Sequence, residues 1–251
     1  MNRQHKRNII ITGGNSGMGR AMAEAFVRVQ DRVFIIGRDE ERLRATEQAL
    51  EPHAACYRAD VSQREQVATT VAEIVERAGI IDVLVNAAGF TGGVLTGVPL
   101  DEAEREWDAT IDANLKGSFL MTMAVAPHLR RPGGRIIFIS SIAAFTGSSR
   151  PGSAIYAASK SGLLGLTCGF ARELSPQGIT VNAIAPGFIA NTNFTGAWSE
   201  ERVNGIIAQT PVGRAGHVDD IAAAALYLAS PGASFVTGEV LNVNGGWLFG
   251  H

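Results

Sequence analysis

Short apolar runs alternate along this chain with longer segments in which apolar residues recur at helical spacing. The short runs predict strands at residues 8–12, 32–36, 54–58, 81–86, 134–140, 180–184 and 239–243. The longer segments predict helices at residues 17–30, 39–50, 62–78, 100–114, 115–131, 154–175 and 217–229. Strands and helices that alternate in this way form a parallel sheet covered by helices on both faces. We therefore predict a doubly wound α/β fold in three layers, with a parallel sheet of seven strands.

The chain is long enough for one large α/β domain, and it contains no internal repeat and no long linker. We predict a single domain over residues 1–251. Residues 191–214 lack a clear period and interrupt the alternation after the sixth predicted strand. Such segments are often functional, so we expect a mobile helical lid over a substrate at about 190–214. Its apolar residues could instead pack against a neighbouring part of the core.

Composition and charge exclude several classes of protein. A net charge of −2 and a pI near 6.2 offer no attraction to nucleic acid or to an anionic membrane, so we expect neither as a partner. The apolar run at residues 8–12 is too short for a signal peptide or a membrane span, which favours a cytoplasmic protein. Cys56 and Cys168 lack metal-type spacing, so we expect two buried, reduced thiols and no metal site.

A glycine-rich segment, TGGNSGMG at residues 12–19, follows the first predicted strand and opens a helix. In that position, backbone N–H groups and the positive end of the helix can face a pyrophosphate. The spacing departs from GxGxxG, because Met22 stands where the third glycine would be. A plain turn between strand and helix is the alternative.

Further motifs give the chain a resemblance to the short-chain dehydrogenase/reductase family over essentially its whole length. TGGNSGMG is similar to the TGxxxGxG turn of that family, and Ala87 replaces the second asparagine of its NNAG motif. The other matching positions are Asp60-Val61, Asn86-Ala87-Ala88-Gly89, Asn114, Tyr156-Ala-Ala-Ser-Lys160 and Pro186-Gly187. The resemblance implies a Rossmann-type fold and an enzyme that transfers hydride between a nicotinamide cofactor and a carbonyl or alcohol.

The resemblance also assigns cofactor contacts. They are Gly13, Asn15, Ser16, Gly17, Met18, Gly19, Arg38, Asp60, Val61, Asn86, Ala87, Ala88, Gly89, Tyr156, Lys160, Pro186, Gly187, Ile189 and Thr192. The backbone of Ile189 would hold the carboxamide of the nicotinamide. The threonine that often follows is displaced by one position, so either Asn191 or Thr192 would contact the pyrophosphate.

The end of the second predicted strand bears on the choice between NADP(H) and NAD(H). An NAD site of this type carries an acidic side chain there, whereas this chain has Gly37 followed by Arg38. The planar, always-charged fork of arginine suits the adenosine 2′-phosphate, and the glycine leaves room for it. Asp39 could serve as the ribose acid, but it begins an acidic run typical of a helix start. We expect NADP(H), although Ser16 is neutral at the family's other phosphate-recognising position.

Tyr156 and Lys160 lie four residues apart in a predicted helix, so both project from one face. A phenol is a poor base at neutral pH, and the charge of Lys160 would lower its pKa. By resemblance, Tyr156 is the general acid/base, Lys160 also binds the nicotinamide ribose, and Asn114 bends its helix and holds a water. Ser141 would hydrogen-bond the substrate oxygen, with Ser140 as its rival.

The substrate cannot be named from these residues. We expect Ser141, Tyr156, Phe194 and Trp198 to contact it, with Phe90, Ala143, Phe145 and Trp247-Leu248-Phe249 as further candidates for the lining of the pocket. Within the family the chain most resembles the 3-oxoacyl-acyl carrier protein reductases, and Arg130, Arg131 and Arg172 could meet an acidic carrier or be ordinary surface charges. Sugar, cyclitol and secondary-metabolite dehydrogenases of the family look much the same. The gap between Ser141 and Tyr156 is slightly longer than in many members, which indicates an enlarged loop.

Three alternatives stay open. The enzyme could be an NAD-dependent alcohol dehydrogenase of the same family, or the chain could sense NADP(H) without chemistry, which the intact Ser-Tyr-Lys set argues against. A nucleotide-sugar epimerase or dehydratase usually needs a longer C-terminal domain. By resemblance, residues 100–131, 154–175 and 239–243 would form the interfaces of a homotetramer, and a dimer is possible.

Overall fold

The apolar runs form seven parallel strands of one sheet in a computed structural model that describes residues 6–190, 192, 195–196 and 198–250. The strands are β1 (Asn8–Thr12), β2 (Arg32–Gly37), β3 (Ala54–Arg58), β4 (Val83–Asn86), β5 (Arg135–Ile139), β6 (Thr180–Pro186) and β7 (Val240–Val243). Their order in the sheet is β3-β2-β1-β4-β5-β6-β7. The prediction of a doubly wound parallel sheet is confirmed. The order reverses between β1 and β4, the place where sheets of this kind bind ligands.

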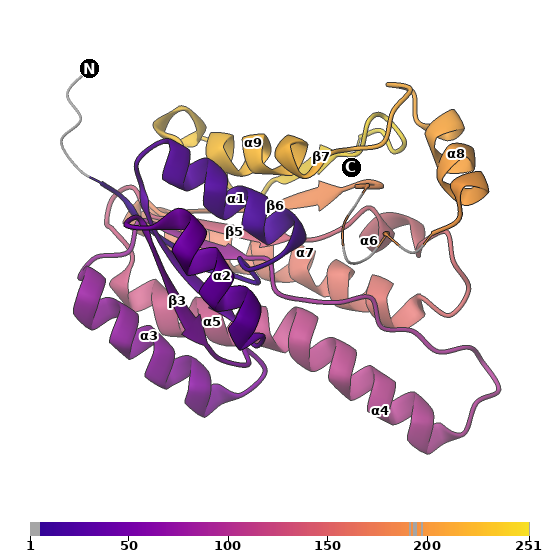
Figure 1. Cartoon of the computed structure of the whole chain (residues 1–251), viewed down its shortest axis with the longest axis horizontal. Helices are drawn as coiled ribbons and strands as arrows, with labels where there is room; N and C mark the ends of the chain where they lie inside the picture. The colour runs from indigo at the N-terminus through magenta and orange to yellow at the C-terminus, as the bar shows by residue number, and fades with distance from the viewer. Residues whose placement is uncertain (1–5, 191, 193–194, 197, 251) are drawn as a thin grey trace.

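Helices cover both faces of the sheet, as Figure 1 shows. One layer is formed by α1 (Gly17–Arg28), α2 (Glu40–Leu50) and α9 (Val218–Leu228). The other is formed by α3 (Arg64–Ala78), α4 (Leu100–Ile111), α5 (Gly117–Val125) and α7 (Ala154–Leu174). Alternate side chains of β1 explain the two layers, because Ile9 and Ile11 pack in one core and Ile10 in the other.

The predicted helices at 100–114 and 115–131 differ from the observed ones. α4 passes into a π-helical turn (Asp112–Lys116), and α5 then runs only to Val125, followed by a 3-10 turn (Ala126–His128) that contains Pro127. The predicted strand at 81–86 begins only at Val83, although Ile81 forms a single bridge to Leu129. The sequence pattern also missed the short helix α6 (Ala143–Thr146).

The segment at about 190–214 is partly helical. Its described helix is α8 (Glu200–Gln209), which begins after Ser199, whose hydroxyl caps the helix by accepting a hydrogen bond from the N–H of Arg202. Ile206 of this helix is buried, so the segment also contributes to packing.

The expectation of two buried thiols is wrong. Cys56 is half-buried, and Cys168 is exposed on α7. Cys168 follows Thr167, which is fully buried, and lies off the buried stripe of the helix that continues at Phe170 and Ala171. A single step along a helix turns the side chain by about 100°, which carries Cys168 away from the sheet.

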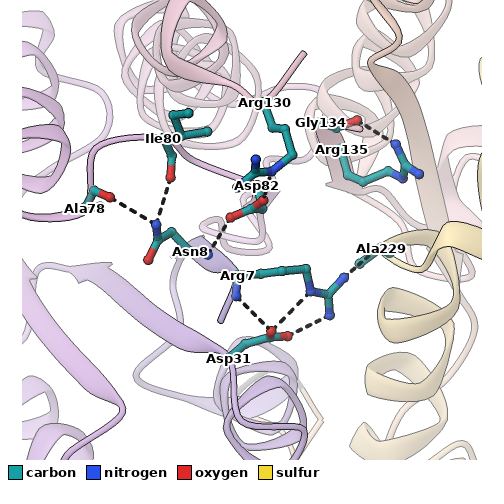
Figure 2. A network of polar contacts seen from close by, with 10 residues as sticks. All are labelled: Arg7, Asn8, Asp31, Ala78, Ile80, Asp82, Arg130, Gly134, Arg135 and Ala229. Carbon is teal, nitrogen blue, oxygen red and sulfur yellow. Dashed lines mark hydrogen bonds and ion pairs between the residues drawn. The ribbon is translucent and has the colours of Figure 1, made fainter. Parts of the chain in front are cut away.

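Polar side chains close the amino ends of the strands (Figure 2). The buried carboxylate of Asp82 accepts hydrogen bonds from the backbone of Asn8 at 2.8 Å and from the side chain of Arg130. Asp31 pairs with Arg7 at 2.6 Å. Arg7 and Arg130 therefore form ion pairs at the amino ends of the strands. The main pocket lies at the opposite, carboxyl ends. No helix in the described part of the chain is both long and apolar enough to cross a membrane.

Candidate active site

A pocket opens at the carboxyl ends of the central strands, where β1, β4, β5 and β6 end. Its walls are formed by the turn after β1, the residues that follow β4, β5 and β6, the start of α7, and part of the segment around α8. The predicted site residues on its lining are Gly13, Ser16, Gly17, Met18, Gly19, Ala87, Ala88, Gly89, Ser141, Tyr156, Lys160, Pro186, Gly187, Ile189, Thr192 and Trp198. A second pocket beside it is lined by Asn15, Arg38, Asp60 and Val61, together with Gly13, Ser16, Ala88 and Gly89.

The turn after β1 has a conformation that depends on its glycines. Gly13 and Gly17 adopt φ angles of +69° and +50°, which favour glycine. A Cβ on Gly19 would lie 2.2 Å from the carbonyl oxygen of Gly13, so the chain can close here only without a side chain. α1 begins at Gly17 with no side-chain cap from Ser16 and no acidic residue in its first turn. Its first N–H groups and its positive end can therefore bind an anion.

The second pocket carries two arginines. Arg38 is largely exposed, and its guanidinium lies 3.7 Å from the carboxylate of Asp60. Asp39 caps α2 by accepting a hydrogen bond from the backbone of Arg42, as its interpretation as a helix start implied. Arg42 lines the same pocket and was missed from the sequence; its only signal was a second basic residue one turn after Arg38. A Cβ on Gly37 would lie 2.9 Å from the side-chain oxygen of Asn15, so this glycine makes room for Asn15.

The segment after β4 joins the two pockets. The N–H groups of Ala87 and Ala88 both donate to the hydroxyl of Thr12 at 3.0 Å. Asn86 lines neither pocket, because its buried side chain donates to Thr122 of α5 at 3.2 Å. Of this motif, Ala88 and Gly89 line both pockets and Ala87 lines the first, whereas the side chain of Asn86 lies behind them.

Asn114 occupies the π-helical turn between α4 and α5 and is fully buried. Its side-chain oxygen accepts a hydrogen bond from the N–H of Phe90 at 2.9 Å, and its amide group donates to the carbonyl of Phe90 and the hydroxyl of Ser159, both at 3.0 Å. The resemblance implied a bend at Asn114, and the helix passes through a π turn at this position. A Cβ on Gly89 would lie 2.6 Å from that side-chain oxygen, so Gly89 permits the close approach.

Tyr156 and Lys160 lie in the first two turns of α7, and the ammonium group of Lys160 is 5.8 Å from the centre of the tyrosine ring. Burial lowers the pKa of Lys160 to about 8. Burial raises the pKa of Tyr156, and hydrogen bonding with the Ser141 hydroxyl opposes that rise. The side chain that lowers the pKa of the phenol in this structure is Ser141. The phenol is therefore protonated at neutral pH.

The two rival serines have different partners. The hydroxyl of Ser140 is buried and donates to the backbone carbonyl of Lys160 at 2.9 Å. The hydroxyl of Ser141 accepts a hydrogen bond from the N–H of Ala143 at 3.1 Å and interacts with Tyr156. The structure thus brings Ser141, and not Ser140, to the phenol.

Aromatic side chains also line the first pocket. Trp198 stacks on Phe188 with ring centres 5.3 Å apart, and Trp247 and Ala143 also line the pocket. Thr192 is buried on the lining, whereas Asn191 and Phe194 lie outside the described residues. Four expected lining residues are placed elsewhere: Phe90 lines the second pocket, and neither lining includes Phe145, Leu248 or Phe249.

Comparisons with known proteins agree with this geometry. A family model described as Enoyl-(Acyl carrier protein) reductase matches residues 13–248. The 3-oxoacyl-(acyl-carrier-protein) reductase FabG of Rickettsia prowazekii is 36% identical over 240 residues, which cover 95% of each chain. The enzyme of the same name from Staphylococcus aureus is 37% identical over 245 residues, which cover 96% of this chain and 97% of the relative.

Solved structures give the same result. A dehydrogenase/reductase from Sinorhizobium meliloti 1021 has a TM-score of 0.89 and 31% identity, covering 98% of this chain and 96% of its own. A blue fluorescent protein from a metagenomic library, in complex with NADPH, has a TM-score of 0.88 and 34% identity, covering 97% and 98%. The chain therefore belongs to the short-chain dehydrogenase/reductase family of oxidoreductases, as its motifs predicted.

Proposed function

We propose that this protein is an NADP(H)-dependent oxidoreductase that interconverts a ketone and a secondary alcohol. The observation that carries the proposal is the pair of hydroxyl groups of Ser141 and Tyr156, which interact at the pocket wall next to Lys160. The names of the relatives and the NADPH bound to one solved structure support it.

A pair of hydroxyl groups is suited to a reacting oxygen. The relatives are named for a 3-oxo substrate, whereas the description of the family model names an enoyl substrate, in which a carbon–carbon double bond would be reduced. Two hydroxyl donors can both hydrogen-bond a carbonyl oxygen and stabilise the negative charge that develops on it. We therefore favour reduction at a carbonyl group.

The reaction needs one hydride and one proton. The reduced nicotinamide supplies the hydride, with its two electrons, to the carbonyl carbon. Tyr156 donates its phenolic proton to the carbonyl oxygen, while Ser141 donates a hydrogen bond to the same oxygen. Lys160 lies behind the phenol and stabilises the transient phenolate until a proton from solvent restores it. Oxidation of the alcohol follows the same steps in reverse.

The residues present fit a dinucleotide of the NADP type. The uncapped start of α1 can hold the pyrophosphate, and Arg38 and Arg42, which line the second pocket, can bind a 2′-phosphate. Asp39, the rival acidic side chain, is occupied as a helix cap. Asp60 lies close enough to Arg38 to offset part of its charge, which keeps NAD(H) as the alternative cofactor.

The sharpest test is the substitution Tyr156→Phe, which removes the proton donor and keeps the ring. We expect kcat for ketone reduction to fall by at least about 10²-fold, while the Kd for NADPH changes little. Tyr57→Phe is the matched control, because Tyr57 packs against Phe34 and lines neither pocket. Unchanged turnover in Tyr156→Phe would contradict the proposal and favour a protein that senses NADP(H) without chemistry.

We also propose a homotetramer in the cytoplasm. Apolar side chains are exposed along the predicted interface helices, namely Leu100 and Trp107 of α4 and Phe119 and Met123 of α5. Such a patch is typical of a surface that a second copy covers, and a dimer would also cover it. Sedimentation velocity measures the assembly directly.

A further inference from the structure

The described lining of the pocket that contains Tyr156 includes basic side chains but no acidic ones. Among the described residues of its lining, the ionisable side chains other than Tyr156 are Arg150, Lys160 and Arg202, and none is an aspartate or glutamate. Lys160 is buried and its ammonium group donates to the carbonyl of Ile139. Arg150 and Arg202 have no role in the proposed proton transfer, so we ask what else their charge could bind in this pocket.

The guanidinium group of Arg202 stacks on an aromatic ring. Arg202 lies in the first turn of α8, and its guanidinium carbon is 3.8 Å from the centre of the Trp198 ring, which itself stacks on Phe188. A guanidinium stacked on an aromatic face still presents its N–H groups at the edge of the plane. Within the described residues, Arg202 forms no ion pair, although Glu200 and Glu201 precede it in sequence.

Arg150 comes from the loop between α6 and α7, which the spacing of Ser141 and Tyr156 indicated to be enlarged. The loop is fixed on its far side, because the carbonyl of Gly152 accepts a hydrogen bond from Val94 at 2.9 Å. α6 and α8, which flank this pocket, lie at the same end of the molecule (Figure 1). Arg150 is exposed on the lining and, among the described residues, it too forms no ion pair.

We infer that the carbonyl substrate bears an anionic group, a carboxylate or a phosphate, which Arg202 and Arg150 bind while its carbonyl oxygen meets Ser141 and Tyr156. The inference rests on the proposed function and adds the substrate class. Arginine matches both anions with paired N–H donors, and a pocket shielded by Trp198 and Trp247 strengthens such hydrogen bonds. The pyrophosphate of the cofactor has its own site at the start of α1, at the glycine turn.

Matched pairs of ketones test the inference. The carboxylate pair is 4-oxocyclohexanecarboxylate and its methyl ester, and the phosphate pair is dihydroxyacetone phosphate and dihydroxyacetone, each measured with NADPH. We expect the wild-type enzyme to prefer the anionic member of at least one pair, and the better pair identifies the anion. Arg202→Gln should lower kcat/KM for that anionic member by about 10- to 100-fold, mainly through KM, and leave the neutral member almost unchanged. Arg150→Gln should act in the same direction by a smaller factor, because Arg150 is exposed.

Two controls separate the explanations. Arg44→Gln removes a guanidinium on α2 that is 70% exposed and lines neither pocket, and it should change neither ketone. The Kd for NADPH, measured by fluorescence, should be the same in Arg202→Gln as in the wild type. A raised Kd would mean that Arg202 binds the cofactor, and it would overturn the inference.

The remaining outcomes are also decisive. Preference of the wild type for the neutral member of both pairs, or an equal loss on both members in Arg202→Gln, would overturn the inference and leave the proposed function intact. If a protein that binds NADPH reduced none of these ketones and no other carbonyl compound, the proposed function itself would be wrong.

Discussion

The ammonium group of Lys160 donates a hydrogen bond to the backbone carbonyl of Ile139 at 2.9 Å, and the two residues thereby join α7 to the carboxyl end of β5. A second hydrogen bond runs in the opposite direction, because the hydroxyl of Ser140 donates to the backbone carbonyl of Lys160. Ser141 follows Ser140 directly, and Tyr156 precedes Lys160 by one helical turn. The two bonds therefore fix the distance between the hydroxyl groups proposed to act on the substrate.

This arrangement predicts different effects for the two serines. Ser141→Ala removes a donor to the developing oxyanion, so we expect kcat to fall by about 10²- to 10³-fold with little change in stability. Ser140→Ala leaves the buried carbonyl of Lys160 without this donor, so we expect a loss of about 1–2 kcal/mol in the free energy of unfolding and a smaller loss of kcat. Urea denaturation and steady-state kinetics on both variants measure the two effects. The opposite pattern would identify Ser140 as the serine that contacts the substrate.

The lowered pKa of Lys160 predicts that cofactor binding depends on pH. Below the pKa of about 8 the side chain is protonated, and above it the neutral form dominates in the free protein. If the protonated form donates to the nicotinamide ribose, binding favours that form, and the Kd for NADPH is constant below this pKa. Above it, the Kd should rise with pH, by at most about tenfold per unit, until the pKa of the complex is reached.

Fluorescence titrations with NADPH over this pH range measure the effect. Lys160→Met, which has a similar length and no charge, should bind more weakly and lose the dependence. The same rise of Kd with pH in Lys160→Met would assign the dependence to another group.

We expect Arg38 to determine the preference for NADPH over NADH. Arg38→Asp replaces the proposed partner of the 2′-phosphate by a like charge, so the Kd for NADPH should rise by at least about tenfold, whereas the Kd for NADH should stay the same or fall. Arg42→Gln should weaken NADPH binding by a smaller factor, since Arg42 lines the same pocket. Initial rates with both cofactors provide the measurement, and a preference for NADH in the wild type would contradict the NADP(H) assignment.

Sequence reasoning was most accurate where one physical requirement dominates. β1 was predicted to its exact bounds because the three isoleucines at its centre form a short apolar run, and the glycine turn follows directly after Thr12. The glycine turn was placed correctly because its conformations require glycine at fixed spacing. The set of Ser141, Tyr156 and Lys160 could be recognised because the proposed reaction requires all three side chains at one place.

The remaining features depend on contacts between residues far apart in sequence. The π-helical turn at Asn114 depends on hydrogen bonds to Phe90 and Ser159, which no local pattern contains. Arg42 and Arg202 occupy the first turns of helices, where charged residues are common on any surface. Only the tertiary structure shows that both side chains line pockets.

A side chain at position 89 should disturb Asn114, because Asn114 fills the space where that side chain would stand. Gly89→Ala would place a Cβ 2.6 Å from the side-chain oxygen of Asn114 and strain the backbone, which has a φ of +158°. Because Asn114 is fully buried, we expect a loss of about 2–3 kcal/mol in the free energy of unfolding and a fall of kcat by more than about tenfold. Gly79→Ala is the matched control: its φ is +73° and no atom lies within 4 Å of the added Cβ, so only backbone strain of about 1–3 kcal/mol is expected, with kcat unchanged. Because strain is common to both variants, a selective loss of kcat in Gly89→Ala would arise from the added Cβ at the pocket, where it meets Asn114 at 2.6 Å and lies 3.6 Å from the ammonium group of Lys160. Equal kcat in the two variants would show that the position of Asn114 does not affect turnover.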